Sequence, residues 1–161
     1  MIRIVLYSLI ALLFIEPFTG SSVNAASTTL TVSATVLSKN RCRFRSANTT
    51  LSFGTLDPLN PVDVNTSATI DFRCQGADPI ATYLITNNDG LYASGPGIPR
   101  MQNTLDAAQY IEYNLVLNPT TGTAPKGIDQ TLIITGDILG SGYQFASIGN
   151  YTDTIVLSIM P

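Results

Sequence analysis

The sequence lacks histidine and tryptophan, and only 12% of its 161 residues are charged. Histidine is the commonest general base and metal ligand, so its absence closes most routes to acid–base catalysis and to zinc binding. Catalysis would have to depend on carboxylates, but the acidic residues are scattered and form no obvious glycosidase-like pair. The chain also has no Gly-x-Ser-x-Gly or phosphate-loop motif. We therefore expect no enzyme activity, no metal and no cofactor.

Positive charge is scarce as well, because 8 Lys and Arg residues stand against 11 Asp and Glu residues, which gives a formal net charge of -3. Proteins that bind nucleic acid depend on Lys and Arg to neutralise phosphate groups. The composition therefore predicts no nucleic-acid partner.

The N-terminus has the pattern of an exported protein. Arg3 precedes an apolar run over residues 4–15, and small residues follow it. The run is shorter than the roughly 20 residues that a membrane-spanning helix needs, and the tripeptide Val23-Asn24-Ala25 suits cleavage by a signal peptidase. We predict a Sec signal peptide over residues 1–25 and no membrane insertion after its removal. An uncleaved N-terminal anchor is the alternative.

Two cysteines, Cys42 and Cys74, then lie in an exported chain, where an even number favours a disulfide over free thiols. The bridge would close a loop of about 33 residues and restrict the unfolded chain by roughly 3 to 4 kcal/mol. A metal site is a poor alternative, because two thiols without histidine cannot complete a tetrahedral shell.

Alternation of apolar and polar residues runs through the rest of the chain, which is typical of strands with one buried face. The longest examples place these residues on the apolar face: Leu30, Val32, Ala34 and Val36; Ala68, Ile70, Phe72 and Cys74; Ile111, Tyr113, Leu115 and Leu117; Ile155, Leu157 and Ile159. Shorter strands are predicted over 51–53, 83–85 and 131–135, loops over 57–63, 93–100 and 118–129, and at most a helical turn or two over 104–109. The pattern predicts one all-β domain, an antiparallel β-sandwich with Greek-key connections.

The Asn87-Asn88-Asp89-Gly90 motif resembles part of a calcium-binding loop. It lacks the ligands expected at the first and last positions of such a loop. Asn and Gly tolerate the positive φ angles of tight turns, so a hairpin turn is the preferred interpretation.

Four basic residues stand at alternate positions, so a strand would place them on one face, with Cys42 and Phe44 turned inward: Lys39, Arg41, Arg43 and Arg45. We call these four residues the cationic stripe. It could dock an acidic neighbour, or it could be a solvated edge that its charge protects from aggregation.

Several segments follow one another in a characteristic order. The strand Val32-Ser33-Ala34-Thr35-Val36 leads to Cys42, then come Leu51-Ser52-Phe53-Gly54, the strand ending at Cys74, Arg100-Met101, Tyr113-Asn114-Leu115, Gly136-Asp137-Ile138 and Gly149-Asn150-Tyr151-Thr152-Asp153-Thr154. In this order they resemble the spore coat protein U domain family, the subunits of archaic chaperone–usher pili of Gram-negative bacteria. The resemblance covers essentially the whole chain after residue 25. The departures are the absence of a Trp-Gly after the Tyr-Asn-Leu strand, and Val116 where a Tyr is common.

The resemblance implies an incomplete immunoglobulin-like sandwich that lacks a final strand. In this family a periplasmic chaperone first covers the open groove, and at an outer-membrane usher the N-terminal segment of the next subunit replaces it by donor-strand exchange. We therefore expect residues 26–37 to be the donor segment, with Leu30, Val32, Ala34 and Val36 filling the groove, and residues 38–161 to be the pilin domain.

The implied protein is a structural subunit of a surface pilus that supports adhesion or biofilm formation. It would pass through the periplasm to the cell surface, and its partners would be the chaperone, the usher and neighbouring pilus subunits. The alternative is a self-contained secreted coat protein or binding module, in which residues 26–37 form the first strand of their own domain.

Overall fold

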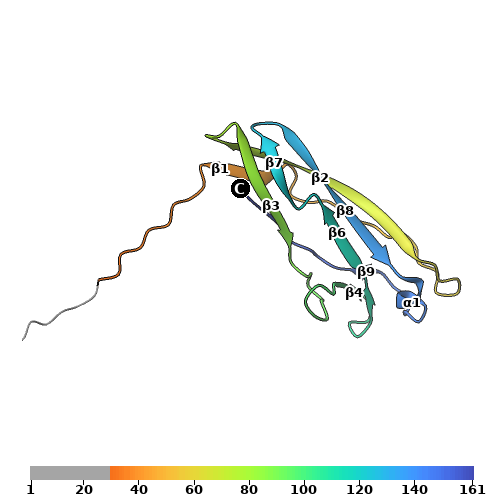
Figure 1. Ribbon diagram of the computed structural model, residues 1–161. Coiled ribbons are helices and arrows are strands. Elements are labelled where there is room, and N and C mark those ends of the chain that lie inside the picture. Colours follow the sequence, from red (N-terminus) through yellow and green to blue (C-terminus); the bar gives the residue numbers. More distant parts are fainter. Residues whose placement is uncertain (1–29) are drawn as a thin grey trace, which may run out of the picture. The chain divides into compact units, whose positions relative to one another are not determined.

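The computed structural model describes residues 30–161, and residues 36–161 form a body whose regular secondary structure is almost entirely strand (Figure 1). Residues 1–29 lie outside the described part of the chain, and with them the predicted signal peptide and residues 26–29 of the predicted donor segment. Within the described residues, no helix combines the length and the apolar character needed to cross a membrane.

The strands pair antiparallel in three sheets. The first has the order β1-β2-β8-β6: β1 Asn40–Phe44, β2 Val64–Gly76, β8 Asp129–Ile138 and β6 Asn114–Asn118. The second has the order β10-β3-β7: β10 Leu157–Met160, β3 Ile80–Asn87 and β7 Thr121–Pro125. The third has the order β5-β4-β9: β5 Tyr110–Glu112, β4 Arg100–Asn103 and β9 Tyr151–Thr152. One short helix, α1 Gly140–Tyr143, follows β8.

The first two sheets share one core, which confirms the predicted antiparallel sandwich. Its buried residues come from β1, β2 and β8 on one side and from β3 and β7 on the other: Cys42, Ile70, Phe72, Cys74, Ala81, Tyr83, Ile85, Ala124, Leu132 and Ile134. The ring of Phe72 lies between those of Tyr83, at 4.8 Å, and Phe44, at 6.5 Å between centroids. Each large apolar side chain that is fully buried contributes about 1.5 to 3 kcal/mol to stability.

The body has two ends, which lie at the top and bottom of Figure 1. At the β1 end, the first residue of β1 pairs with the last residue of β2, and the first residue of β3 pairs with the last residue of β7. Asn40 lies opposite Gly76, and Ile80 lies opposite Pro125. At the α1 end, the third sheet and α1 enclose a second cluster of buried residues: Ile111, Ile138 and Tyr143. Tyr143 fixes the loop below it, because the Val62 N–H donates to the Tyr143 hydroxyl at 2.9 Å and that hydroxyl donates to the Val62 carbonyl at 2.8 Å.

The strand predicted over 51–53 is wrong, because residues 51–56 join no sheet. The alternation there has a different cause. Leu51 and Phe53 are half-buried and pack on Gly136 of β8, where a Cβ atom would lie only 2.6 Å from Leu51 and 2.7 Å from Phe53. The segment therefore covers the first sheet without pairing with it.

Three further boundaries differ from the sequence predictions. The predicted loop over 118–129 contains β7, whose Gly and Pro residues hide its strand character. The predicted strand over 111–117 is divided between β5 and β6, which belong to different sheets. Residues 104–109 form turns and no helix, while the helix occurs at Gly140–Tyr143, where burial of Tyr143 outweighs a glycine-rich sequence with poor helix propensity.

Candidate functional site

Two edge strands of the sandwich lie next to each other and are unpaired on the sides that face away from their sheets. β1 is the last strand of the first sheet and β10 the last strand of the second, and the two are in contact. Among residues 30–161, β1 pairs only with β2, and β10 only with β3. Edge strands present unpaired backbone N–H and C=O groups to which another strand can pair. We call the edges of β1 and β10 the open side.

Apolar side chains on the open side are only partly covered. Phe44 of β1 and Leu157 and Ile159 of β10 pack against the main core but remain half-buried. Met160 is 48% exposed, and Val156, directly before β10, is 55% exposed. Covering such surface stabilises a protein by roughly 25 cal/mol per Å² of apolar area. The open side therefore offers both an apolar contact and a backbone to pair with.

The predicted disulfide is present and fixes one edge of the open side. Cys42 of β1 and Cys74 of β2 are bonded, are direct partners in the ladder between the two strands, and are both buried. β1 has only 5 residues and no second neighbour in its sheet. The covalent bond therefore holds a short edge strand against the rest of the first sheet.

The described part of the predicted donor segment has the pattern of a strand but forms none. Residues 30–38 have no regular secondary structure. Leu30 is 84% exposed, Val32 83% and Val36 94%, and Ala34 is exposed as well. Residues 30–37 include no proline, glycine or charged residue. Nothing in this stretch therefore prevents strand formation.

The structure places all four residues of the cationic stripe on the surface: Lys39, Arg41, Arg43 and Arg45. Lys39 precedes β1, and the alternation along the strand leaves Cys42 buried and Phe44 half-buried between the arginines. Arg43 lies directly opposite Arg73 of β2.

Asp129 of β8 neutralises part of this positive charge. Its two carboxylate oxygens accept hydrogen bonds of 2.6 Å from Nε and Nη2 of Arg73, and Arg45 Nε lies 3.5 Å away. The hydrogen bonds with Arg73 lower the pKa of Asp129 and raise the pKa of Arg73. Both partners are surface groups, so the pair contributes little to stability and mainly orients the two side chains.

The hairpin turn predicted for Asn87–Gly90 is wrong. β3 ends at Asn87, and the chain continues into a loop that leads to a different sheet. The Asn88 N–H donates to the Val156 carbonyl at 3.1 Å, and the Asn88 side-chain oxygen accepts from the Val156 N–H at 2.8 Å. Asn88 thus extends the contact between β3 and the C-terminal strand.

Residues 30–161 contain no group of three or more His, Cys, Asp or Glu that could hold a metal ion.

Asp153 of the C-terminal Gly-x-Tyr-x-Asp-Thr segment joins three parts of the α1 end. One of its oxygens accepts from the backbone N–H of Leu91 at 2.9 Å and of Thr154 at 2.7 Å, and the other accepts from the Tyr113 hydroxyl at 2.7 Å. Gly90, with a φ of +88°, packs against the same carboxylate and leaves no room for a Cβ atom. Burial raises the pKa of Tyr113, and the hydrogen bond to Asp153 raises it further. The role of Asp153 in this arrangement is structural.

Sequence reasoning did not single out the residues that shape the open side. Alternation marked Leu157 and Ile159 as inward-facing residues, but it gave no sign that they would stay half-buried. That property depends on which strands are the last of their sheets, and period-two alternation is the same in central and edge strands.

A sequence profile of the Spore Coat Protein U domain matches residues 26–158. The chain belongs to this family. Membership makes this Spore Coat Protein U chain a structural pilus protein and not an enzyme, and it confirms the resemblance stated above. The comparison with curated proteins gave no match.

Among solved structures, the Spore Coat Protein U chain is similar to a chain in the structure described as "Chaperone-tip adhesin complex is vital for synergistic activation of CFA/I fimbriae biogenesis". The sequence identity is 12% and the TM-score 0.47, over 76% of this chain and 41% of that chain. This chain thus spans less than half the length of the other, and so distant a likeness supports no argument about function.

Proposed function

We propose that this Spore Coat Protein U protein is a subunit of a chaperone–usher pilus and polymerises by donor-strand exchange. The observation that carries the proposal is the coexistence of two features in one chain: the open side between β1 and β10, and an exposed, alternating segment without a strand partner just before β1. Because every copy has both features, copies can join head to tail by adding a strand to an exposed sheet edge.

The two features match in length. An extended segment from Leu30 to Val36 spans about 20 to 25 Å, because a strand rises about 3.3 Å per residue. β10 itself spans about 13 Å on the same basis, and residues Ile155 and Val156 directly before it lengthen this edge to about 20 Å. The alternate residues Leu30, Val32, Ala34 and Val36 would then all face the sandwich interior over the length of the open edge.

The energetics favour occupation of the open side. Burying Leu30, Val32 and Val36 contributes roughly 1.5 to 3 kcal/mol for each side chain. The same event covers Phe44, Leu157 and Ile159, which are half-buried in the isolated subunit. Backbone hydrogen bonds to the edge of β10 then satisfy groups that otherwise need water.

The sequence between donor segment and β1 disfavours an intramolecular arrangement. To fill the open side of its own domain, the segment would have to fold back on β1 through a tight turn over residues 37–39, which read Leu-Ser-Lys. Hairpin loops of two or three residues depend on Gly or Asn at positions with positive φ, and this stretch has neither. Transfer to a second copy requires no such turn.

The partners and location follow from the same features. An apolar, unpaired edge invites aggregation before assembly, so the newly exported subunit requires a periplasmic chaperone that covers it. An outer-membrane usher then directs exchange of the chaperone for the donor segment of the next subunit, and the product is a fibre on the cell surface that supports adhesion or biofilm formation. The cleaved signal peptide over residues 1–25 starts this route.

Deletion of residues 26–37 tests the proposal. When the variant is co-expressed with a cognate chaperone and usher, we expect a folded, chaperone-bound subunit, but no fibres in electron micrographs and no SDS-resistant ladder in gels.

A matched pair of point variants gives a finer test. Val32→Asp places a charge on the face that would enter the neighbour and is expected to reduce fibre yield at least tenfold, because an unpaired buried charge is very costly. Ser33→Asp places the same charge on the opposite face and should assemble almost normally. Normal polymerisation of the deletion variant refutes the donor assignment. A native chain that stays monomeric and stable by itself supports a self-contained coat protein or binding module.

A further inference from the structure

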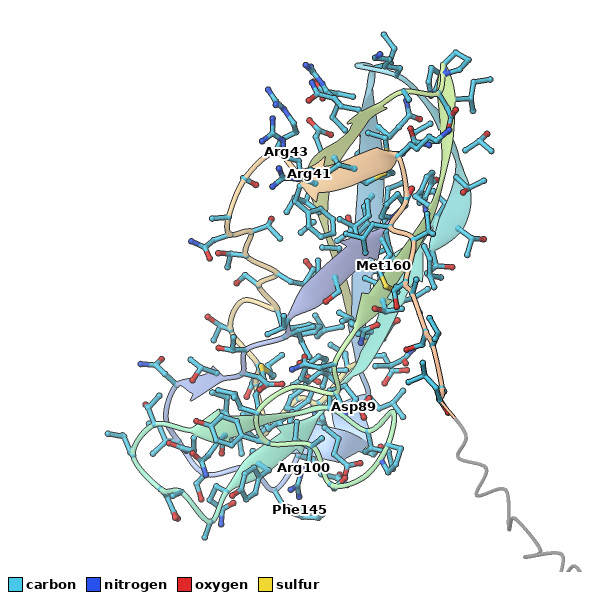
Figure 2. All side chains as sticks on the ribbon, turned by 90° about the vertical axis from the view of Figure 1, so that its left-hand side faces the viewer. Arg41, Arg43, Asp89, Arg100, Phe145 and Met160 are labelled. Atoms are coloured by element: carbon cyan, nitrogen blue, oxygen red, sulfur yellow. A yellow bond between two sulfur atoms is a disulfide. The ribbon has the colours of Figure 1, made fainter. Side chains whose placement is uncertain are left out.

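Charge is divided unevenly between the two ends of the body. Six basic residues lie toward the β1 end: Lys39, Arg41, Arg43, Arg45, Arg73 and Lys126. Three acidic residues lie at the same end: Asp71, Asp78 and Asp129. Six basic and three acidic residues give this end a formal charge of +3. Figure 2 shows Arg41 and Arg43 close together at this end, with Asp89 well separated from them at the other.

The α1 end has the opposite charge. Five exposed and two half-buried carboxylates lie on its loops and strands: Asp57, Asp63, Asp89, Asp106 and Glu112; Asp137 and Asp153. Among the described residues of this end, Arg100 alone is basic. Seven acidic residues and one basic residue give the end a formal charge of -6. Arg100 is engaged locally, because its Nε donates to the Tyr92 carbonyl at 2.8 Å and its guanidinium lies 4.3 Å from the centroid of the Tyr110 ring.

Ion pairing within the subunit does not balance these charges. The salt bridges in the described part of the chain join Asp129 to Arg45 and Arg73, at the β1 end. No acidic side chain among residues 30–161 forms a salt bridge with Lys39, Arg41 or Arg43. No basic side chain among these residues forms one with a carboxylate of the α1 end. The two unpaired sets are of opposite sign and lie at opposite ends.

We propose that the cationic stripe of one subunit docks on the acidic α1 end of the next copy in the fibre. The inference rests on the proposed function, because it requires that the donor segment enters a second copy. Lys39, the first residue of the stripe, follows the last residue of the donor segment after only one intervening residue, Ser38. Wherever the donor segment leaves the neighbour's open side, the stripe must therefore be close by.

The direction of β10 shows which end of the neighbour this is. Leu157 pairs with Asn87 and Met160 with Leu84, so β10 runs from the α1 end toward the β1 end. The second sheet is antiparallel throughout. A donor segment that continues this pattern runs the opposite way and leaves the open side at the α1 end. The incoming stripe thus meets the end with charge -6; the reverse direction would bring it to the +3 end, where like charges repel.

The α1 end also has a recess of suitable chemistry, which β5, β6 and β8 line on the side of the first sheet opposite β1. Glu112 and Asp137 line a pocket of about 550 Å³, together with Tyr113 and Asn114. Asp137 accepts from the side-chain amide of Asn65 through Oδ1, and Glu112 Oε1 lies 3.4 Å from the Ser94 hydroxyl, so each carboxylate keeps its second oxygen available. An arginine guanidinium, planar and rich in donors, suits two such carboxylates.

Charge reversal with matched controls tests the docking contact. Arg41→Glu is preferable to a change at Arg43, because Arg41 lies opposite the neutral Gln75, whereas a glutamate at position 43 would lie opposite Arg73 and pair with it. We expect Arg41→Glu to slow assembly of the full mature chain about three- to tenfold at low salt, because charge reversal at an interface acts mainly on association. The difference should vanish near 1 M salt, where the Debye length is about 3 Å.

The control is Lys126→Glu, which makes the same charge change at the same end but outside the stripe, and it should assemble within about twofold of the native rate. Glu112→Lys combined with Arg41→Glu should restore assembly. A synthetic peptide of residues 26–37 should bind all variants as it binds the native subunit, because it contains no charge and occupies only the open side.

The outcomes separate the two proposals. If the native subunit fails to bind the peptide, both the proposed function and the docking contact fail. If peptide binding is intact but Arg41→Glu assembles at the native rate, or Lys126→Glu is slowed as much as Arg41→Glu, the docking contact alone is overturned. Loss of the chaperone complex in Arg41→Glu, before any assembly, would assign the stripe to the chaperone and also overturn it.

Discussion

The two sides of the sandwich end in different kinds of edge. On one side, β6 and β7 are the last strands of their sheets, but a two-residue connection, Pro119 and Thr120, joins them, and the Ile85 N–H donates to the Thr120 carbonyl at 2.6 Å. On the open side, β1 and β10 come from opposite ends of the body's sequence and no ladder joins them in residues 30–161. The chain therefore connects the two sheets directly on one side, which we call the closed side, and leaves them unconnected on the open side within residues 30–161.

The sequences of β7 and β10, the edge strands of the second sheet, fit this difference. β7 includes Gly122 and Pro125, residues that discourage further strand pairing. β10 reads Leu-Ser-Ile-Met and has no proline, glycine or charge. Side-chain exposure alone does not separate the sides, because Leu117 of β6 and Ile159 of β10 are both half-buried. What distinguishes the closed side is therefore the direct connection through residues 119 and 120, which the open side lacks within residues 30–161.

The largest effect that we expect on this comparison comes from the disulfide. Replacing both Cys42 and Cys74 by alanine should lower the free energy of unfolding by about 2 to 5 kcal/mol, because the bond holds a short edge strand that has a partner on one side only. Denaturant unfolding of the subunit complemented with the peptide of residues 26–37 measures the loss.

The control for the disulfide variant lies on the closed side. Val116→Ala removes an exposed side chain of β6 and should change the free energy of unfolding by less than about 0.5 kcal/mol. A double cysteine variant that is as stable as the native subunit would show that β1 is held by its ladder with β2 alone.

A smaller effect should separate two half-buried side chains. Ile159→Ala and Leu117→Ala each remove a half-buried side chain that packs against the main core. Each should lower the free energy of unfolding by about 1 to 2.5 kcal/mol. Only Ile159→Ala should weaken binding of the peptide of residues 26–37, by about tenfold, or about 1.4 kcal/mol. Isothermal titration measures the affinity, and equal weakening by both variants would mean that the peptide does not distinguish the two sides.

Much of the fold could be predicted from residue pattern. Period-two alternation located β2 and β10, and the predicted export signal together with an even cysteine count led to the Cys42–Cys74 disulfide. These features are local or depend on composition, so a single sequence carries them. The strand β7 was missed because its glycine and proline residues are typical of loops, and Ala124 alone of its residues is buried.

The open side could not be located from pattern alone. Alternation marked Leu30–Val36 and Leu157–Ile159 in the same way, although the first has no strand partner in the structure and the second is an edge strand. The order of strands in a sheet depends on contacts between residues far apart in sequence, which periodicity does not contain. The separation of charge between the two ends is hidden for the same reason, because the basic and acidic residues sort only after folding.

Hydrogen exchange on the open side tests the central claim most directly. The subunit lacking residues 26–37 is compared, by mass spectrometry, with and without a synthetic peptide of those residues. The account predicts that the peptide slows exchange in β1 and β10, residues 40–44 and 157–160, and leaves β6 and β7 unchanged. Slower exchange in β6 or β7, or no change in β1 and β10 while the peptide is bound, would contradict it.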